Sequence, residues 1–145
     1  MKNAPTEASA GPPLREPSDE ELLQVMADFL AMGHADNIVA MFRQEPRYWS
    51  WTGRLLEDER YAVRLGVSVL FEQLVTLCPD YLPLALPSLA VQLDNPVDRV
   101  RGEAVSVLGI IGSEAALALV RSRLDDTSPQ VAEIAHDILG LPFHG

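Results

Sequence analysis

One pattern occurs twice in the last third of the chain, and its two copies are 31 residues apart. The pattern is an acidic residue, a valine six positions later, an alanine four positions after that, and then Leu-Gly. The two copies are Asp94, Val100, Ala104, Leu108-Gly109 and Asp125, Val131, Ala135, Leu139-Gly140. Apolar residues at intervals of four are typical of one face of an α-helix. A fixed period of this length, filled with helical spacing, indicates an α-solenoid in which stacked helical repeats share one core.

A third copy precedes these two. Glu57 stands in the acidic position, Val63 and Val67 in the two core positions, and Phe71 in place of leucine. The interval from Val63 to Val100 is 37 residues, and the extra length falls around the turn at 78–81. The predicted fold is therefore all-α, a short α-solenoid of about eight helices in four antiparallel pairs. The predicted pairs cover residues 18–45, 47–77, 79–112 and 113–141.

The start of the folded region is marked by a helix-capping motif. Ser18 and Glu21 form an S-x-x-E capping box, in which each side chain accepts a hydrogen bond from a free backbone N–H of the first turn. The preceding segment, 1–17, is rich in Pro, Ala and Gly and is predicted to be a disordered leader. Residues 18–145 are predicted to form one repeat domain. Pro87 is expected to kink a helix that runs from Pro79 to Leu93.

Composition limits the classes of function. The 145 residues are 48% hydrophobic and carry a formal charge of −10, with a single cysteine, Cys78. No internal disulfide is possible, no apolar run is long enough for a signal peptide or a membrane span, and a cytoplasmic location is expected. Binding to nucleic acid or anionic lipid requires clustered Lys and Arg, so the acidic balance argues against both.

The second of these repeats resembles a known family. Val100-Arg101-Gly102-Glu103-Ala104, followed by Val107-Leu108-Gly109-Ile110-Ile111-Gly112, is similar to the HEAT-like repeat of the phycobilisome-lyase type, D-x5-V-R-x2-A-x3-L-G-x-I-G. The resemblance covers 93–141 well and 49–74 less closely. It implies an ARM/HEAT-like superhelix, and such solenoids mostly serve as interaction scaffolds.

The arginine of the Val-Arg pair occurs at Arg64 and Arg101, while Ala132 takes its place in the last repeat. We expect these arginines to lie beside the turns between repeats and to pair with Asp94 or Asp125, or to cap carbonyl groups. The alternative is that they bind a ligand or a partner.

The enzymes that this resemblance could imply depend on residues that this chain does not contain. The deoxyhypusine hydroxylases of this superfamily hold two irons with His-Glu dipeptides, which this chain does not contain. Glu133-x-x-His136 supplies two potential ligands on one helical face, not a complete metal site. Neither His34 nor His144 stands in a catalytic motif, and no residue pattern specifies a tetrapyrrole pocket. No cofactor is predicted.

The sequence thus favours a non-catalytic protein–protein interaction scaffold or adaptor. The alternative is an accessory, lyase-type protein that binds a small molecule or a chromophore. Candidate partner-binding residues are mostly on the second helices of the pairs, with two aromatic residues in addition: Arg64, Glu72, Arg101, Glu133, Asp137, Tyr48 and Trp51. Trp49, between those aromatics, is predicted to lie in the core. A monomer or a homodimer is expected, since exposed ends of a stack need cover.

Overall fold

The computed structural model describes residues 16–145, and every regular element in this range is helical. The predicted all-α class is confirmed. The predicted leader lies outside the described residues except for its last two positions. No helix in the described range is both long enough and apolar enough to cross a membrane.

The described chain contains eight α-helices and two 3-10 helices. In chain order they are α1 (Asp19–Ala31), α2 (Ala35–Gln44), η1 (Pro46–Trp51), α3 (Thr52–Leu55), α4 (Tyr61–Leu77), η2 (Pro79–Ala85), α5 (Leu86–Gln92), α6 (Asp98–Ile111), α7 (Glu114–Arg121) and α8 (Pro129–Leu139).

Local sequence signals define several helix ends. The predicted capping box is present at α1, where the Glu21 N–H donates to Ser18 Oγ at 3.1 Å and the Ser18 N–H donates to Glu21 Oε1 at 2.8 Å. Helices α6 and α8 end at Gly112 and Gly140, whose φ angles of 65° and 70° lie in the left-handed region that favours glycine. Pro129 is the first residue of α8, where its missing N–H costs no helical hydrogen bond.

The segment predicted as a single α-helix from Pro79 to Leu93 is divided into η2 and α5. Residues 46–55 are divided in the same way, into η1 and α3. The predicted kink at Pro87 is wrong, because Pro87 lies in the first turn of α5 and not in a helix interior. Pro83 lies inside η2, and proline prevents a continuous α-helical ladder through this segment. The shorter 3-10 pattern accommodates the break.

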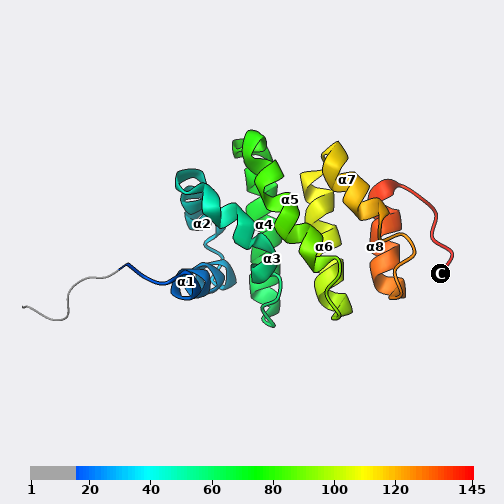
Figure 1. The fold of residues 1–145 in the computed structure, drawn as a ribbon, viewed down its shortest axis with the longest axis horizontal. Coiled ribbons are helices and arrows are strands. Elements are labelled where there is room, and N and C mark those ends of the chain that lie inside the picture. The colour runs from blue at the N-terminus through cyan, green and yellow to red at the C-terminus, as the bar shows by residue number, and fades with distance from the viewer. Residues whose placement is uncertain (1–15) are drawn as a thin grey trace, which may run out of the picture.

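Four of the helices form a row, in which α1 contacts α4, α4 contacts α6, and α6 contacts α8. We call α1, α4, α6 and α8 the helix row. The remaining segments pack beside it: η1 contacts η2, α3 contacts α5, and α7 contacts both α6 and α8. Figure 1 shows the elements following one another in chain order from α1 at one end of the molecule to α8 at the other.

The predicted core positions are buried at the same place in three helices of the row. Val63, Val100 and Val131 are each the third residue of their helix and are at most 2% exposed. Trp49 is completely buried, as predicted, and its indole N–H donates to the Phe42 carbonyl at 3.0 Å. The Trp49 ring also packs edge-on against Phe71. The core is therefore continuous from the aromatic cluster near η1 into the helix row.

Two glycines allow neighbouring helices of the row to approach closely. A Cβ atom on Gly66 of α4 would lie 2.7 Å from the Leu30 carbonyl oxygen of α1. A Cβ atom on Gly109 of α6 would lie 2.6 Å from Ile138 Cδ1 of α8. At Gly102, also on α6, a Cβ atom would lie 3.4 Å from Ile134 Cδ1, which is an ordinary contact.

Replacement of these glycines by alanine should separate close packing from helix propensity. Gly66→Ala places a methyl group against backbone, so we expect a loss of about 1–3 kcal/mol in the free energy of unfolding. Gly102→Ala is the matched control, and its gain in helix propensity, roughly 0.5–1 kcal/mol, should leave stability unchanged or raised. Urea unfolding followed by circular dichroism measures both. Equal effects of the two substitutions would contradict the close approach at Gly66.

Candidate functional site

The loops that lead into α4, α6 and α8 contain the same side-chain turn. In each loop an Asp or Asn side chain accepts the backbone N–H two residues later, so that the chain turns into the following helix. The pairs are Asp58 with Arg60 at 2.9 Å, Asn95 with Val97 at 2.8 Å, and Asp126 with Ser128 at 2.8 Å. These turn residues come one position after the acidic residues that the sequence pattern singled out.

Arg101 connects two of these loops. Its guanidinium group donates to both carboxylate oxygens of Asp126, at 2.8 and 3.0 Å, and to the Asn95 carbonyl at 2.9 Å. The Arg101 and Asp126 side chains are 11% and 2% exposed, so this is a buried, bidentate ion pair. The pKa of the Asp126 carboxyl is below its ordinary value, mainly because Arg101 donates hydrogen bonds to it. The hydrogen bond from the Ser128 N–H contributes less in the same direction. The same pair raises the pKa of Arg101.

Arg64 has the same place one step earlier in the helix row. It donates to the Glu59 carbonyl at 2.9 Å and to Glu103 Oε2 of α6 at 2.8 Å. The turn residue equivalent to Asp126 is here the neutral Asn95, and the carboxylate partner comes from α6 instead. The expected pairing of Arg64 and Arg101 with Asp94 or Asp125 is wrong, whereas the expected carbonyl contacts are present.

This placement also corrects the choice of surface residues. Arg64 is buried and Arg101 is half-buried, and both guanidinium groups are held by internal acceptors. Neither therefore belongs to a surface that is free to contact a partner.

Substitutions at Asp126 should distinguish the ion pair from the turn. Asp126→Asn keeps the side-chain oxygen that accepts the Ser128 N–H, as Asn95 does naturally, but removes the charge; we expect a loss of about 1–2 kcal/mol in the free energy of unfolding. Asp126→Ala removes both interactions and should cost about 3 kcal/mol. The exposed Asp94 is the control, and Asp94→Asn should leave the unfolding midpoint unchanged.

The pH dependence follows from the direction of the pKa shift of Asp126. A carboxyl whose pKa is lowered by folding stabilises the folded state above its unfolded pKa of about 3.9 and loses that contribution as the pH falls through the folded pKa. The difference in unfolding free energy between the wild type and Asp126→Asn should therefore be full near neutral pH and shrink below about pH 4. Urea titrations at several pH values measure it, and a pH-independent difference would contradict an ionised Asp126.

The exposed face of the helix row changes in character from α4 to α8. Three positions recur at the repeat spacing, and on α4 they carry Tyr61, Leu65 and Val69, which are 65%, 50% and 39% exposed. We call these three residues the apolar stripe. The equivalent positions are Asp98, Gly102 and Ser106 on α6, and Pro129, Glu133 and Asp137 on α8. The face thus runs from apolar on α4, through Asp98 and two small residues on α6, to the acidic Glu133 and Asp137 on α8.

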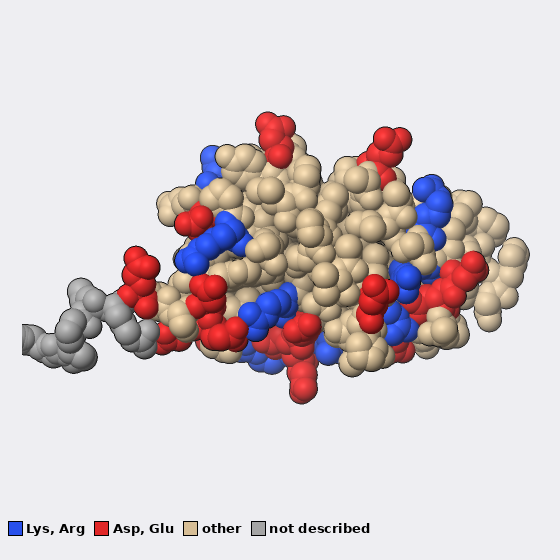
Figure 2. Space-filling view, in the orientation of Figure 1, with Lys and Arg blue, Asp and Glu red and all other residues tan. Residues whose placement is uncertain are grey.

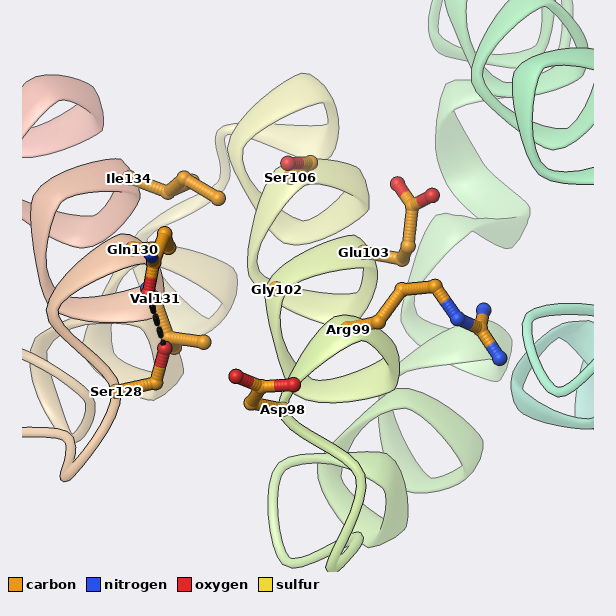
Figure 3. A pocket seen from close by; sticks show the side chains of 9 residues that line it. All are labelled: Asp98, Arg99, Gly102, Glu103, Ser106, Ser128, Gln130, Val131 and Ile134. Atoms are coloured by element: carbon orange, nitrogen blue, oxygen red, sulfur yellow. Dashed lines mark hydrogen bonds between the residues drawn. The ribbon is translucent and has the colours of Figure 1, made fainter. Parts of the chain in front are cut away.

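A shallow groove of about 330 Å³ lies on this face between α6 and α8. We call it the α6–α8 groove. Figure 3 shows Val131 and Ile134 of α8 facing Gly102 of α6, while Arg99 and Glu103 extend away from α8. The missing side chain at Gly102 leaves the space that forms the groove.

Three of the predicted surface residues are exposed. Glu72, Glu133 and Asp137 form no ion pair with any residue of the described range. Glu133 and Asp137 both lie on the exposed face of α8. The sequence pattern does not reveal the apolar stripe as a surface feature, because Val63 and Val67 have the same spacing of four residues on the adjacent, buried face of α4.

The predicted aromatic candidates lie elsewhere. Tyr48 and Trp51 belong to η1, are half-buried, and pack against each other in a tilted arrangement, with a centroid distance of 4.9 Å and an interplanar angle of 57°. The Arg47 guanidinium lies over both rings, 5.2 and 5.5 Å from their centroids. The two rings are partly covered by each other and by Arg47, so less of their surface is available to contact a partner.

Charged side chains are interleaved where the helices of the row begin. Figure 2 shows Lys or Arg next to Asp or Glu along the lower edge of one face, the edge at which α6 and α8 start in Figure 1. Pairs near the other end of the row include Arg54 with Glu20 at 2.8 Å and Arg60 with Asp28 at 3.0 Å. Such exposed pairs contribute little to stability.

The histidine considered as a metal ligand is occupied within its own helix. His136 Nδ1 lies 2.7 Å from the Ala132 carbonyl oxygen, and the ring packs against Phe143. Within residues 16–145, no three His, Cys, Asp or Glu side chains are grouped so that they could hold a metal ion. Cys78 is half-buried and has no disulfide partner.

Comparison with known proteins adds no relative. No protein-family model, no curated protein and no solved structure matches this chain.

Proposed function

We propose that the described chain is a short α-solenoid of HEAT-like repeats in antiparallel pairs, of the phycobilisome-lyase repeat type. Three observations support the proposal: the recurring Asx turn, the buried valine at the third position of α4, α6 and α8, and the arginine at the fourth position of α4 and α6 that pairs with a carboxylate of the following repeat. The turn and the valine occur three times and the arginine twice, at the spacing seen in the sequence. Helices α4, α6 and α8 are then the second helices of successive pairs.

This solenoid functions as a non-catalytic scaffold that binds a protein partner through the exposed face of the helix row. The observation that carries the proposal is the apolar stripe, because three large apolar side chains at consecutive helical turns remain in contact with water. Contiguous exposed apolar surface of this kind often marks a protein-binding site. An amphipathic segment that covered the stripe would bury it as a helix-in-groove partner does. A cytoplasmic location is part of the proposal.

The second candidate is a lyase-type accessory function with a small-molecule or chromophore ligand. The α6–α8 groove supports it, since its volume of about 330 Å³ is at the low end for small-molecule sites. A site that encloses most of a large pigment needs more depth than a shallow groove provides. The protein-binding function therefore has the stronger support.

Affinity capture from the source cells tests the proposal. The double variant Leu65→Gln/Val69→Gln removes apolar surface without adding charge and should abolish recovery of a protein partner. Leu84→Gln/Val91→Gln is the matched control, because both residues are exposed and apolar but belong to η2 and α5. That control should recover the same partner in the same amount as the wild type.

Circular dichroism establishes that all variants are folded before capture. Equal recovery by the stripe variant and the wild type would contradict the proposed surface. Recovery of a bound pigment with no protein would support the lyase-type alternative.

A further inference from the structure

We propose that the partner segment recognised by the helix row is a basic amphipathic segment, with apolar side chains over the apolar stripe and Lys or Arg side chains over α8. This inference rests on the proposed scaffold function and specifies its partner class.

At the α4 end of the surface, the apolar stripe borders a charged pair between α4 and α6. Next to the stripe, the Glu103 carboxylate is 2.8 Å from the Arg64 guanidinium, so its charge is neutralised within the protein. A partner that covers Leu65 and Val69 therefore buries apolar surface without desolvating an unpaired carboxylate at Glu103. This end favours apolar anchors on the partner.

The middle of the surface allows close approach. Gly102 occupies the position equivalent to Leu65, and with no side chain it leaves the α6–α8 groove open above Val131 and Ile134. Arg99 is the basic residue among those that line the groove, and Figure 3 shows its guanidinium directed away from α8. The side of the groove formed by α8 thus presents no positive charge to a partner.

The far end of the surface is acidic. Glu133 and Asp137 lie one helical turn apart on α8, both exposed and without an ion pair in the described range. Two unpaired carboxylates next to an apolar groove attract a cationic side chain and repel phosphate groups. Lys or Arg on a protein segment supplies the complementary charge.

A second copy of this chain fits the surface less well. Its own charge is −10, and its equivalent face offers apolar and acidic groups but no cluster of basic residues to cover Glu133 and Asp137. Two copies paired through their stripes would leave the α8 carboxylates without partners. A basic segment from another protein satisfies both ends.

The arrangement also predicts the spacing of the partner's residues. Adjacent packed helices are separated by about 8–10 Å, so α4 and α8 are roughly 20 Å apart across the row. A helix rises 1.5 Å per residue, which corresponds to about 13 residues between the apolar anchors and the basic residues. In an extended segment the separation would be about 6 residues.

A peptide selection tests this inference with the full chain as bait. A displayed library of random peptides, about 20 residues long so that a helix can span the surface, is selected on the immobilised protein. The enriched peptides are synthesised with a fluorescent label, and their binding is measured by anisotropy. We expect enrichment of peptides that combine Leu, Ile or Phe with a separate cluster of Lys or Arg.

Variants then assign each end of the peptide. Leu65→Gln/Val69→Gln should weaken binding by about tenfold or more. Glu133→Gln/Asp137→Asn should weaken it about three- to tenfold and reduce its dependence on salt between about 50 and 200 mM. The controls are Leu84→Gln/Val91→Gln and Asp36→Asn/Asp80→Asn, which alter exposed residues outside the helix row and should leave affinity unchanged.

The outcomes separate this inference from the scaffold proposal. Peptides that depend on Leu65 and Val69 but contain no excess of basic residues would overturn the basic partner and leave the scaffold intact. Enriched peptides that are insensitive to both variants, or no enrichment at all, would overturn both. Sedimentation of the wild type alone that shows a dimer lost in Leu65→Gln/Val69→Gln would identify a second copy as the occupant and overturn the basic segment.

Discussion

The buried pair between Arg101 and Asp126 is the interaction on which the placement of α8 beside α6 depends. One guanidinium group binds the carboxylate of the following loop and the carbonyl of its own loop, so two loops are held at a fixed distance. Asp126 in turn accepts the Ser128 N–H and directs the chain into α8. Because both charges are largely removed from water, loss of the Asp126 carboxylate leaves the Arg101 guanidinium without its ion-pair partner. Asp126 therefore contributes both the turn into α8 and the negative charge that pairs with Arg101.

A similar arginine–carboxylate pair joins α4 to α6. Where Asn95 replaces an aspartate in the turn, Arg64 finds its carboxylate on α6, at Glu103. Both versions satisfy backbone carbonyls in the loop before the arginine's own helix. The arginines are thereby removed from the surface, which leaves acidic residues such as Glu133 and Asp137 exposed and gives the far end of the helix row its negative charge.

Much of the local structure was predictable from sequence because it depends on neighbouring residues. The capping box at Ser18, the buried valines and the terminal Gly112 and Gly140 all follow from short-range rules, and the all-α class follows from them. The 3-10 segments could not be predicted, because a proline near the start of a segment does not reveal which turn pattern replaces the α-helical one. The acidic partners of the arginines could not be predicted either, since Glu103 and Asp126 come into reach only when the helices pack together. The exposure of the apolar stripe depends on how α4 is rotated against its neighbouring helices, which local sequence does not specify.

Arg64 and Arg101 each follow a buried valine directly, so the residues that hold the helices together occupy two adjacent positions of each helix. The other side of the helix is left to vary. Tyr61, Leu65 and Val69 on α4 and Glu133 and Asp137 on α8 are exposed, so packing between the helices constrains them little, whereas Gly102 is buried against Val131 and Ile134. Exchanges at the exposed positions alter stability little, as is usual for surface positions. The exposed side of these helices can therefore acquire a different binding preference while their packing is retained, and the contrast between Leu65 and Glu133 is an instance of that freedom within one molecule.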